Sequence, residues 1–149
     1  DIIEQGHLFG IHPEGTRSPD GRLYKAHTGA ARLALETGCP VIPTGLFGTD
    51  KIMKIGQTIP SKGTCTVIYG EPVYPPQHQE GTGLTRREVR DFADKISRAI
   101  QQITGQEYVD EYAQVVKKQM AAEAAQKAAD QAKKDASAAK AEASAEPEL

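Results

Sequence analysis

The 149-residue sequence contains no asparagine and only two cysteines, Cys39 and Cys65. Without asparagine the chain has no acceptor site for N-linked glycosylation. The two cysteines do not have the spacing of a metal-binding or redox motif, and we expect two inert, buried thiols rather than a disulfide. A G-x-x-x-x-G-K-[ST] motif is also missing, which excludes a P-loop enzyme.

Strong net charge and long apolar runs are absent as well. The 18 basic and 20 acidic residues leave a formal net charge of −2, which argues against a general nucleic-acid partner. No apolar stretch approaches the roughly 18 residues that a membrane-spanning helix needs. The length is that of one ordinary domain.

The most informative segment is H-P-E-G-T-R-S, which runs from His12 to Ser18. A short apolar run precedes it and a Ser-Pro-Asp-Gly turn follows, so the pattern predicts a buried strand over residues 7–12 that ends in a loop. Open α/β sheets bind ligands beyond the carboxyl ends of their strands, which is where this loop would lie.

The residue types in this loop suit an anionic ligand. Arg17 carries a planar guanidinium with five donors, which matches a phosphate or a carboxylate. Glu14 can hold that guanidinium in position or act on a substrate group itself. Gly15 allows the backbone to bend and a ligand to come close. The alternative is a solvated surface pair of Glu14 and Arg17, which would contribute little.

Three segments predict an α/β fold. Residues 29–37 have the pattern of a short helix, with Gly38 placed as its C-terminal cap. Residues 41–47 predict a second buried strand. Strand, helix and strand in this order imply a parallel pair with a right-handed crossover. We therefore expect a partial, mostly parallel sheet with flanking helices.

The C-terminal half predicts a third strand and two helices. Residues 64–69 are β-branched and aromatic, as in a strand. Thr85 and Glu88 form the pattern of a capping box, and apolar residues then recur every three or four positions as far as Gly105. Residues 106–120 repeat a helical pattern.

The last segment, residues 121–149, is rich in Ala, Lys and Glu and has no large apolar residue before Leu149. Its composition favours helix, but it offers no apolar face that packing could stabilise. We expect a solvated helix that becomes disordered near Glu146 and Pro147. The alternative is a helix that binds a partner or a membrane surface.

Three segments resemble the 1-acyl-glycerol-3-phosphate acyltransferase family. Pro13 to Ser18 match the signature F-P-E-G-T-R-S without a gap, with His12 in place of the Phe. Lys25–Ala31 resembles the Lys/Gly segment that opens a helix in the family, and Pro40–Pro43 resembles its later V-P-V-x-P block. The resemblance covers roughly residues 5 to 105, so we expect residues 1–105 to be the C-terminal part of an acyltransferase domain.

The resemblance implies an activity and its partners. Such an enzyme transfers a fatty acyl group from an acyl thioester, on CoA or acyl carrier protein, to the free hydroxyl of lysophosphatidic acid and forms phosphatidic acid. It needs no metal or redox cofactor. The resemblance also implies a peripheral location on the cytoplasmic face of the cell membrane, with membrane contact through an N-terminal part that precedes Asp1.

By the same resemblance, the substrate-binding residues are Glu14, Gly15, Thr16, Arg17 and Lys25. Arg17 would hold the phosphate of the acyl acceptor. Lys25 would reach a phosphate or a CoA; the alternative is a solvated charge in front of a helix.

One family motif is missing. Members carry H-x4-D, in which the His is the catalytic base, but the residues five positions after the four histidines are His12, Arg17, Arg32 and Gly83. We therefore expect the base to lie upstream, no catalytic residue in this chain, and no activity of the chain alone. Two alternatives remain: a non-enzymatic phosphate-binding fragment, or an acyltransferase for another lysophospholipid or a glycolipid.

Overall fold

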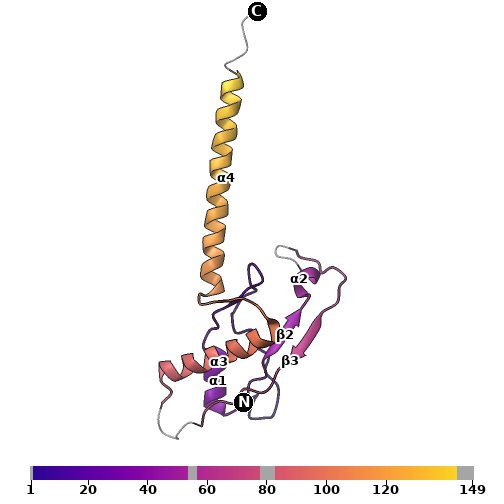
Figure 1. Cartoon of the computed structure of the whole chain (residues 1–149), viewed down its shortest axis with the longest axis vertical. Helices are drawn as coiled ribbons and strands as arrows, with labels where there is room; N and C mark the ends of the chain where they lie inside the picture. The colour runs from indigo at the N-terminus through magenta and orange to yellow at the C-terminus, as the bar shows by residue number, and fades with distance from the viewer. Residues whose placement is uncertain (1, 54–56, 78–82, 144–149) are drawn as a thin grey trace, which may run out of the picture. The chain divides into compact units, whose positions relative to one another are not determined.

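The computed structural model describes residues 2–53, 57–77 and 83–143, with side chains as far as residue 134 (Figure 1). The elements in chain order are β1 (Leu23–Tyr24), α1 (Gly29–Thr37), β2 (Thr44–Phe47), α2 (Thr49–Ile52), β3 (Thr66–Tyr69), α3 (Arg86–Thr104), β4 (Tyr108–Val109) and α4 (Ala113–Ala143). The chain divides into two compact units, Asp1–Ala113 and Gln114–Leu149. Helices and strands alternate in the first unit, which confirms the predicted α/β class.

The core of the first unit lies between α1 and α3, which pack against each other (Figure 1). Apolar residues recur on one face of α3 at intervals of three and four, and the small residues of α1 allow the two helices to approach closely. The buried members of this core are Ala31, Ala34, Leu35, Val73, Val89, Phe92, Ala93 and Ile96. Full burial of a side chain such as Phe or Ile contributes roughly 1.5–3 kcal/mol.

The ends of both core helices follow the predicted signals. Gly38 ends α1 in the left-handed conformation, with φ of 71°, and its backbone N–H donates to the carbonyl of Ala34 at 2.9 Å. At the start of α3, Thr85 and Glu88 form both hydrogen bonds of the capping box. Gly105 ends α3 with φ of 65°.

The strands form two small sheets. β1 pairs with β4 in parallel, with Leu23 opposite Tyr108. β2 pairs with β3 in antiparallel register, with Thr44 opposite Tyr69. A parallel pair is therefore present, but it forms between β1 and β4, which the sequence pattern did not predict as partners.

The expected strand over residues 7–12 is wrong, because these residues form no strand. Leu8 is 97% exposed in the structure. A strand needs a neighbouring edge for its backbone groups, and the hydrogen bonds of β2 go to β3 instead. The parallel pair with a crossover through α1 is wrong for the same reason.

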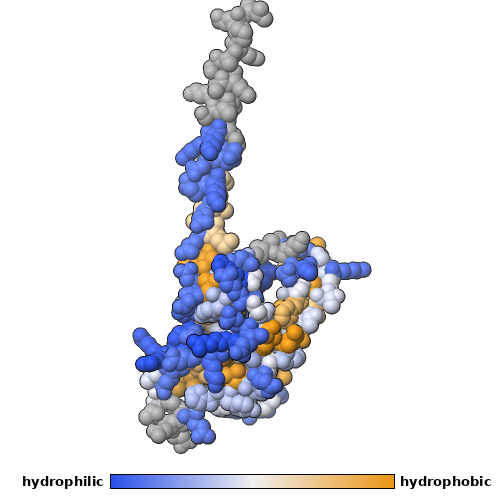
Figure 2. Space-filling model, viewed as in Figure 1, coloured by the Kyte–Doolittle hydropathy of each residue, from blue (hydrophilic) through white to orange (hydrophobic). Residues whose placement is uncertain are grey.

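The other two predicted strands are shorter than expected. Of residues 41–47, β2 takes Thr44–Phe47, and Val41 forms only an isolated bridge with Val73. β3 begins at Thr66 and is exposed along its whole length. Figure 2 shows apolar surface over the region of β2 and β3.

The segment after Gly105 differs from the predicted helix over residues 106–120. Tyr108 and Val109 form β4, because β1 offers them a backbone partner, and the helix begins only at Ala113. It then continues to Ala143, and the side chains of residues 118–134 are exposed and mostly polar (Figure 2). The described part of the tail, residues 121–143, is helical. Glu146 and Pro147 lie outside the described residues, and the domain boundaries at 105 and 120 stay predictions.

Two further sequence expectations concern the cysteines and membrane-spanning helices. Cys39 and Cys65 are both free, but only the first is partly buried, and the second is exposed because β3 is exposed. Among the described residues, no helix combines the length and the apolar character that crossing a bilayer requires.

Candidate functional site

The loop over residues 12–18 is a tight turn anchored at its base. The backbone N–H of Gly15 donates to the carbonyl of His12 at 3.1 Å, and Gly15 has φ of 69°, in the left-handed region that glycine adopts without strain. The backbone N–H of His27 donates to the carbonyl of Pro13 at 2.7 Å. The start of the loop is thereby held against the residues that lead into α1.

Glu14 faces β1. Its Oε2 atom accepts a hydrogen bond of 2.9 Å from the backbone N–H of Tyr24, whose side chain is fully buried. A buried backbone donor without a partner would be costly, so Glu14 supplies an acceptor that the short strand needs. The half-buried carboxylate therefore fixes the loop to β1.

Arg17 is exposed. Within residues 2–53, 57–77 and 83–134, no hydrogen bond or ion pair reaches its guanidinium, so the solvated pair of Glu14 and Arg17 does not form. Five N–H donors remain for an anion from solution. Thr16, directly before it, is half-buried.

Lys25 is engaged elsewhere. Its Nζ atom lies 2.8 Å from Oδ1 of Asp110, just after β4. This hydrogen bond raises the pKa of Lys25 and lowers the pKa of Asp110. An anion at Lys25 would have to compete with Asp110, and a role in substrate binding stays a prediction.

Three residues that the sequence reasoning did not single out follow the loop in the sequence. Asp20, Arg22 and Tyr24 form a cluster of hydrogen bonds. The hydrogen bond from Arg22 lowers the pKa of Asp20 to about 2, and burial raises the pKa of Tyr24. Their spacing of two, typical of side chains on one side of a strand, was the available signal.

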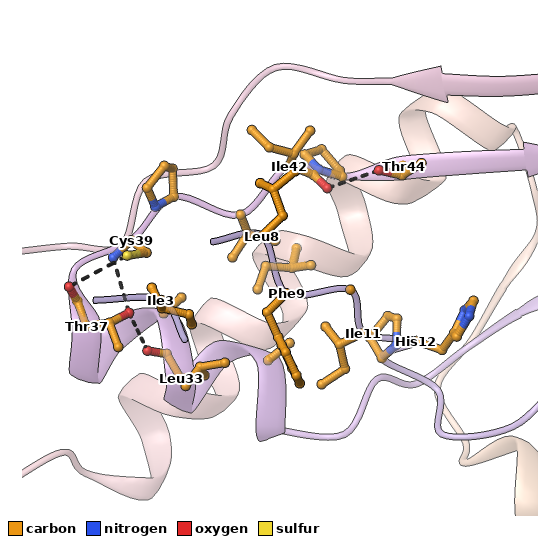
Figure 3. A pocket seen from close by; sticks show the side chains of 18 of the residues that line it. Ile3, Leu8, Phe9, Ile11, His12, Leu33, Thr37, Cys39, Ile42 and Thr44 are labelled. Carbon is orange, nitrogen blue, oxygen red and sulfur yellow. Dashed lines mark hydrogen bonds between the residues drawn. The ribbon is translucent and has the colours of Figure 1, made fainter. Parts of the chain in front are cut away.

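A pocket of about 730 Å³ lies next to the loop (Figure 3). Figure 3 shows Leu8 and Phe9 from the N-terminal segment, Leu33 from α1 and Ile42 from the segment before β2 around it. The lining is predominantly apolar and includes His12 and Pro13 but none of the five predicted substrate-binding residues. The pocket therefore lies beside the loop, and the predicted substrate-binding residues do not line it.

No pair of a base and an orienting carboxylate is present among the described residues, which include His7, His12 and His27. The ring of His27 stacks on Tyr112, with centroids 4.7 Å apart. The described residues also contain no cluster of three or more His, Cys, Asp or Glu side chains that could hold a metal ion.

The loop and α1 lie in the part of the chain that known proteins share. Residues 1–46 match the family model described as Acyltransferase. The matched segment is similar to the acyltransferase family. It contains Glu14, Arg17 and Lys25. It also contains the hydrogen-bonded cluster of Asp20, Arg22 and Tyr24.

Curated relatives agree with this family. A chloroplastic 1-acyl-sn-glycerol-3-phosphate acyltransferase of Brassica napus is 43% identical over 75 residues, which are 50% of this chain and 22% of the relative. A chloroplastic protein of the same name from Arabidopsis thaliana is 40% identical over 75 residues, 50% of this chain and 21% of the relative. The matches thus span about a fifth of the length of these relatives.

One solved structure is similar as well. It is the 1-acyl-sn-glycerophosphate (LPA) acyltransferase, PlsC, from Thermotoga maritima, with 29% sequence identity and a TM-score of 0.44. The similarity covers 61% of this chain and 36% of the Thermotoga protein.

Proposed function

We propose that this chain forms part of a lysophosphatidic acid acyltransferase and that Arg17 binds the phosphate of the acyl acceptor. The observation that carries the proposal is the exposed guanidinium of Arg17, for which the described residues provide no partner, on a loop that Glu14 fixes to β1. The names of the relatives and the matched family support the reaction class.

The chemistry assigns Arg17 to binding and orientation. A fixed cation beside the phosphate holds the acceptor so that its free hydroxyl faces the acyl thioester. A base takes the hydroxyl proton, the oxygen forms an ester bond with the acyl carbon, and the thiolate leaves and is protonated. We assign that base to no residue of this chain. The donor is an acyl-CoA or an acyl carrier protein thioester.

The pocket beside the loop fits a lipid acceptor or donor. Its mostly apolar lining includes His12 and Pro13 at the start of the loop, so a hydrocarbon chain lying there would place a polar headgroup near the loop. The proposed place of action is the cytoplasmic membrane surface, where lysophosphatidic acid is available.

Two other functions fit the same loop. A phosphate-binding fragment without chemistry is favoured by the absence of a paired histidine base among the described residues. An acyltransferase for another lysophospholipid or a glycolipid would use the same machinery with a different headgroup.

The proposed role of Arg17 is tested by titrating the 149-residue chain with sn-glycerol 3-phosphate, followed by NMR chemical shifts. In Arg17→Ala, loss of a charge-assisted hydrogen bond should cost about 1.5–3 kcal/mol, which weakens binding by roughly one to two orders of magnitude. Arg87→Ala is the matched control, because that side chain is 91% exposed on α3 and makes only a 3.7 Å ion pair within its helix.

Equal binding by the Arg17→Ala variant and the original chain would reject the assignment of the phosphate to Arg17. Binding of inorganic phosphate as tightly as sn-glycerol 3-phosphate would favour a general anion site. To separate the lysolipid acceptors, lysophosphatidic acid is compared with a lysophospholipid whose phosphate carries a choline.

A further inference from the structure

The side chains of Asp20, Arg22 and Tyr24, which follow the loop in the sequence, form one closed set of hydrogen bonds. The phenol of Tyr24 donates to Oδ2 of Asp20 at 2.8 Å. Nη2 of Arg22 donates to the same phenol oxygen at 3.1 Å, and Nε of Arg22 donates to Oδ2 of Asp20 at 2.8 Å. Each of the three groups thus contacts the other two.

The cluster is tied to the backbone around it. Oδ1 of Asp20 accepts from the backbone N–H of Arg22 at 3.1 Å, and Oγ of Ser18 accepts from the backbone N–H of Gly21 at 2.9 Å. On the far side of the turn, the carbonyl of Gly21 accepts from the side chain of Gln106 at 2.6 Å. The turn after Ser18 is therefore fixed in place by side chains at both ends.

Tyr24 connects this cluster to the anion-binding loop. Its ring is fully buried, and its backbone N–H is the donor that Glu14 accepts. The phenol and the backbone N–H of one residue therefore hold the two sides of the loop. One side is Glu14, before Arg17, and the other is Asp20, after it.

Arg17 lies between these two anchors and has no described anchor of its own. The direction in which its guanidinium points then depends on the backbone of residues 14–20, and this backbone is held from both sides through Tyr24. A binding group held in one geometry pays less conformational entropy when the ligand binds.

We propose that Asp20, Arg22 and Tyr24 are positioning residues for the anion site and hold the loop over residues 14–18 in the conformation that presents Arg17 to a phosphate. They act through the backbone and do not touch the ligand. The inference rests on the proposed role of Arg17 and deepens it.

The test uses Tyr24→Phe, which keeps the buried ring and the backbone N–H but removes the phenol. Tyr74→Phe is the matched control, because Tyr74 is 64% exposed and no described residue bonds to its phenol. The hydrogen bonds of the phenol to the charged Asp20 and Arg22 side chains act on the ligand only through the backbone, so losing them should raise the Kd for sn-glycerol 3-phosphate about threefold to tenfold. The backbone amides of residues 15–17 should become more mobile in ¹⁵N relaxation, a local change that loss of overall stability alone would not produce.

A second variant keeps the test independent of folding. Arg22→Gln changes a side chain that is 39% exposed, and it should produce the same rise in Kd and in loop mobility. Arg22→Lys, which retains the charge beside Asp20, should restore part of the affinity. Arg87→Gln is its control on the exposed face of α3.

The two proposals fail in different ways. If Arg17→Ala abolishes binding while Tyr24→Phe and Arg22→Gln bind like the original chain, the positioning role is overturned and the phosphate site stands. If Arg17→Ala binds like the original chain, the phosphate site itself is overturned. A rise in Kd without a rise in amide mobility at residues 15–17 also contradicts positioning through the backbone.

Discussion

The carboxylate of Glu14 accepts a 2.9 Å hydrogen bond from the backbone N–H of Tyr24, ten residues further along the chain. This hydrogen bond joins a residue of the matched signature to a residue of the two-residue strand β1. The acidic residue of the signature stabilises the loop, and the basic residue, Arg17, is left exposed.

Removing the Glu14 carboxylate should destabilise the first unit. Glu14→Ala leaves a buried backbone N–H without an acceptor, which should lower the free energy of unfolding by about 1–3 kcal/mol. Glu14→Gln, which keeps a carbonyl acceptor, should lower it less. Urea unfolding measures both, with Glu36→Ala on the exposed side of α1 as the control. An alanine variant as stable as the original chain would show that water replaces the carboxylate at no cost.

Stability should fall in acid because of Asp20. Its pKa is lowered from 3.8 in the unfolded chain to about 2 in the folded one. A depressed pKa means that the stabilisation is fully present above about pH 4 and is lost as the pH falls toward 2. Thermal unfolding between pH 5 and pH 2 should show a drop in Tm that is smaller in Asp20→Asn. Asp91→Asn, on α3, should leave the drop unchanged; an equal effect of both variants would contradict the assignment to Asp20.

The chain alone should not release thiol from an acyl-CoA at the rate of a full-length relative. General base catalysis contributes roughly 10²–10⁴-fold, and no histidine among the described residues is paired with a carboxylate. A thiol-release assay with lysophosphatidic acid as acceptor measures this. Turnover comparable to that of a full-length relative would place the base within these 149 residues, and alanine substitution of each of the four histidines in turn would then identify it.

Deleting residues 121–149 should leave the stability of the first unit nearly unchanged. The side chains of residues 118–134 are exposed, and an Ala-rich helix without tertiary packing is marginal in water. The Tm and the binding of sn-glycerol 3-phosphate should therefore change little, and limited proteolysis should cut this segment first. Loss of binding to anionic vesicles on deletion would instead favour a membrane-surface helix.

Elements controlled by local signals were predictable from the sequence. The C-terminal cap of α1 at Gly38 and the capping box of Thr85 and Glu88 are determined by residues within one helical turn, and the structure contains both. The amphipathic pattern of α3 likewise indicated which face is buried. These features need no information about distant segments, because their hydrogen bonds form within the element itself.

The sequence pattern did not predict which strands pair with each other. The apolar run over residues 7–12 and the pair Tyr108–Val109 both have strand-forming residues, yet only the second finds a backbone partner, β1. Which edge a strand meets depends on loop closure and on packing far away in the chain, and the pattern of one segment contains neither.

The sequence by itself identified the candidate site as a signature and predicted Arg17 as its anion-binding group. The tertiary structure decided how that signature is used. It assigned the Glu14 carboxylate to Tyr24 and the Lys25 ammonium to Asp110, 85 residues further along the chain. A charged side chain takes the partner that the fold places within hydrogen-bond distance, and that partner is known only once the chain has folded.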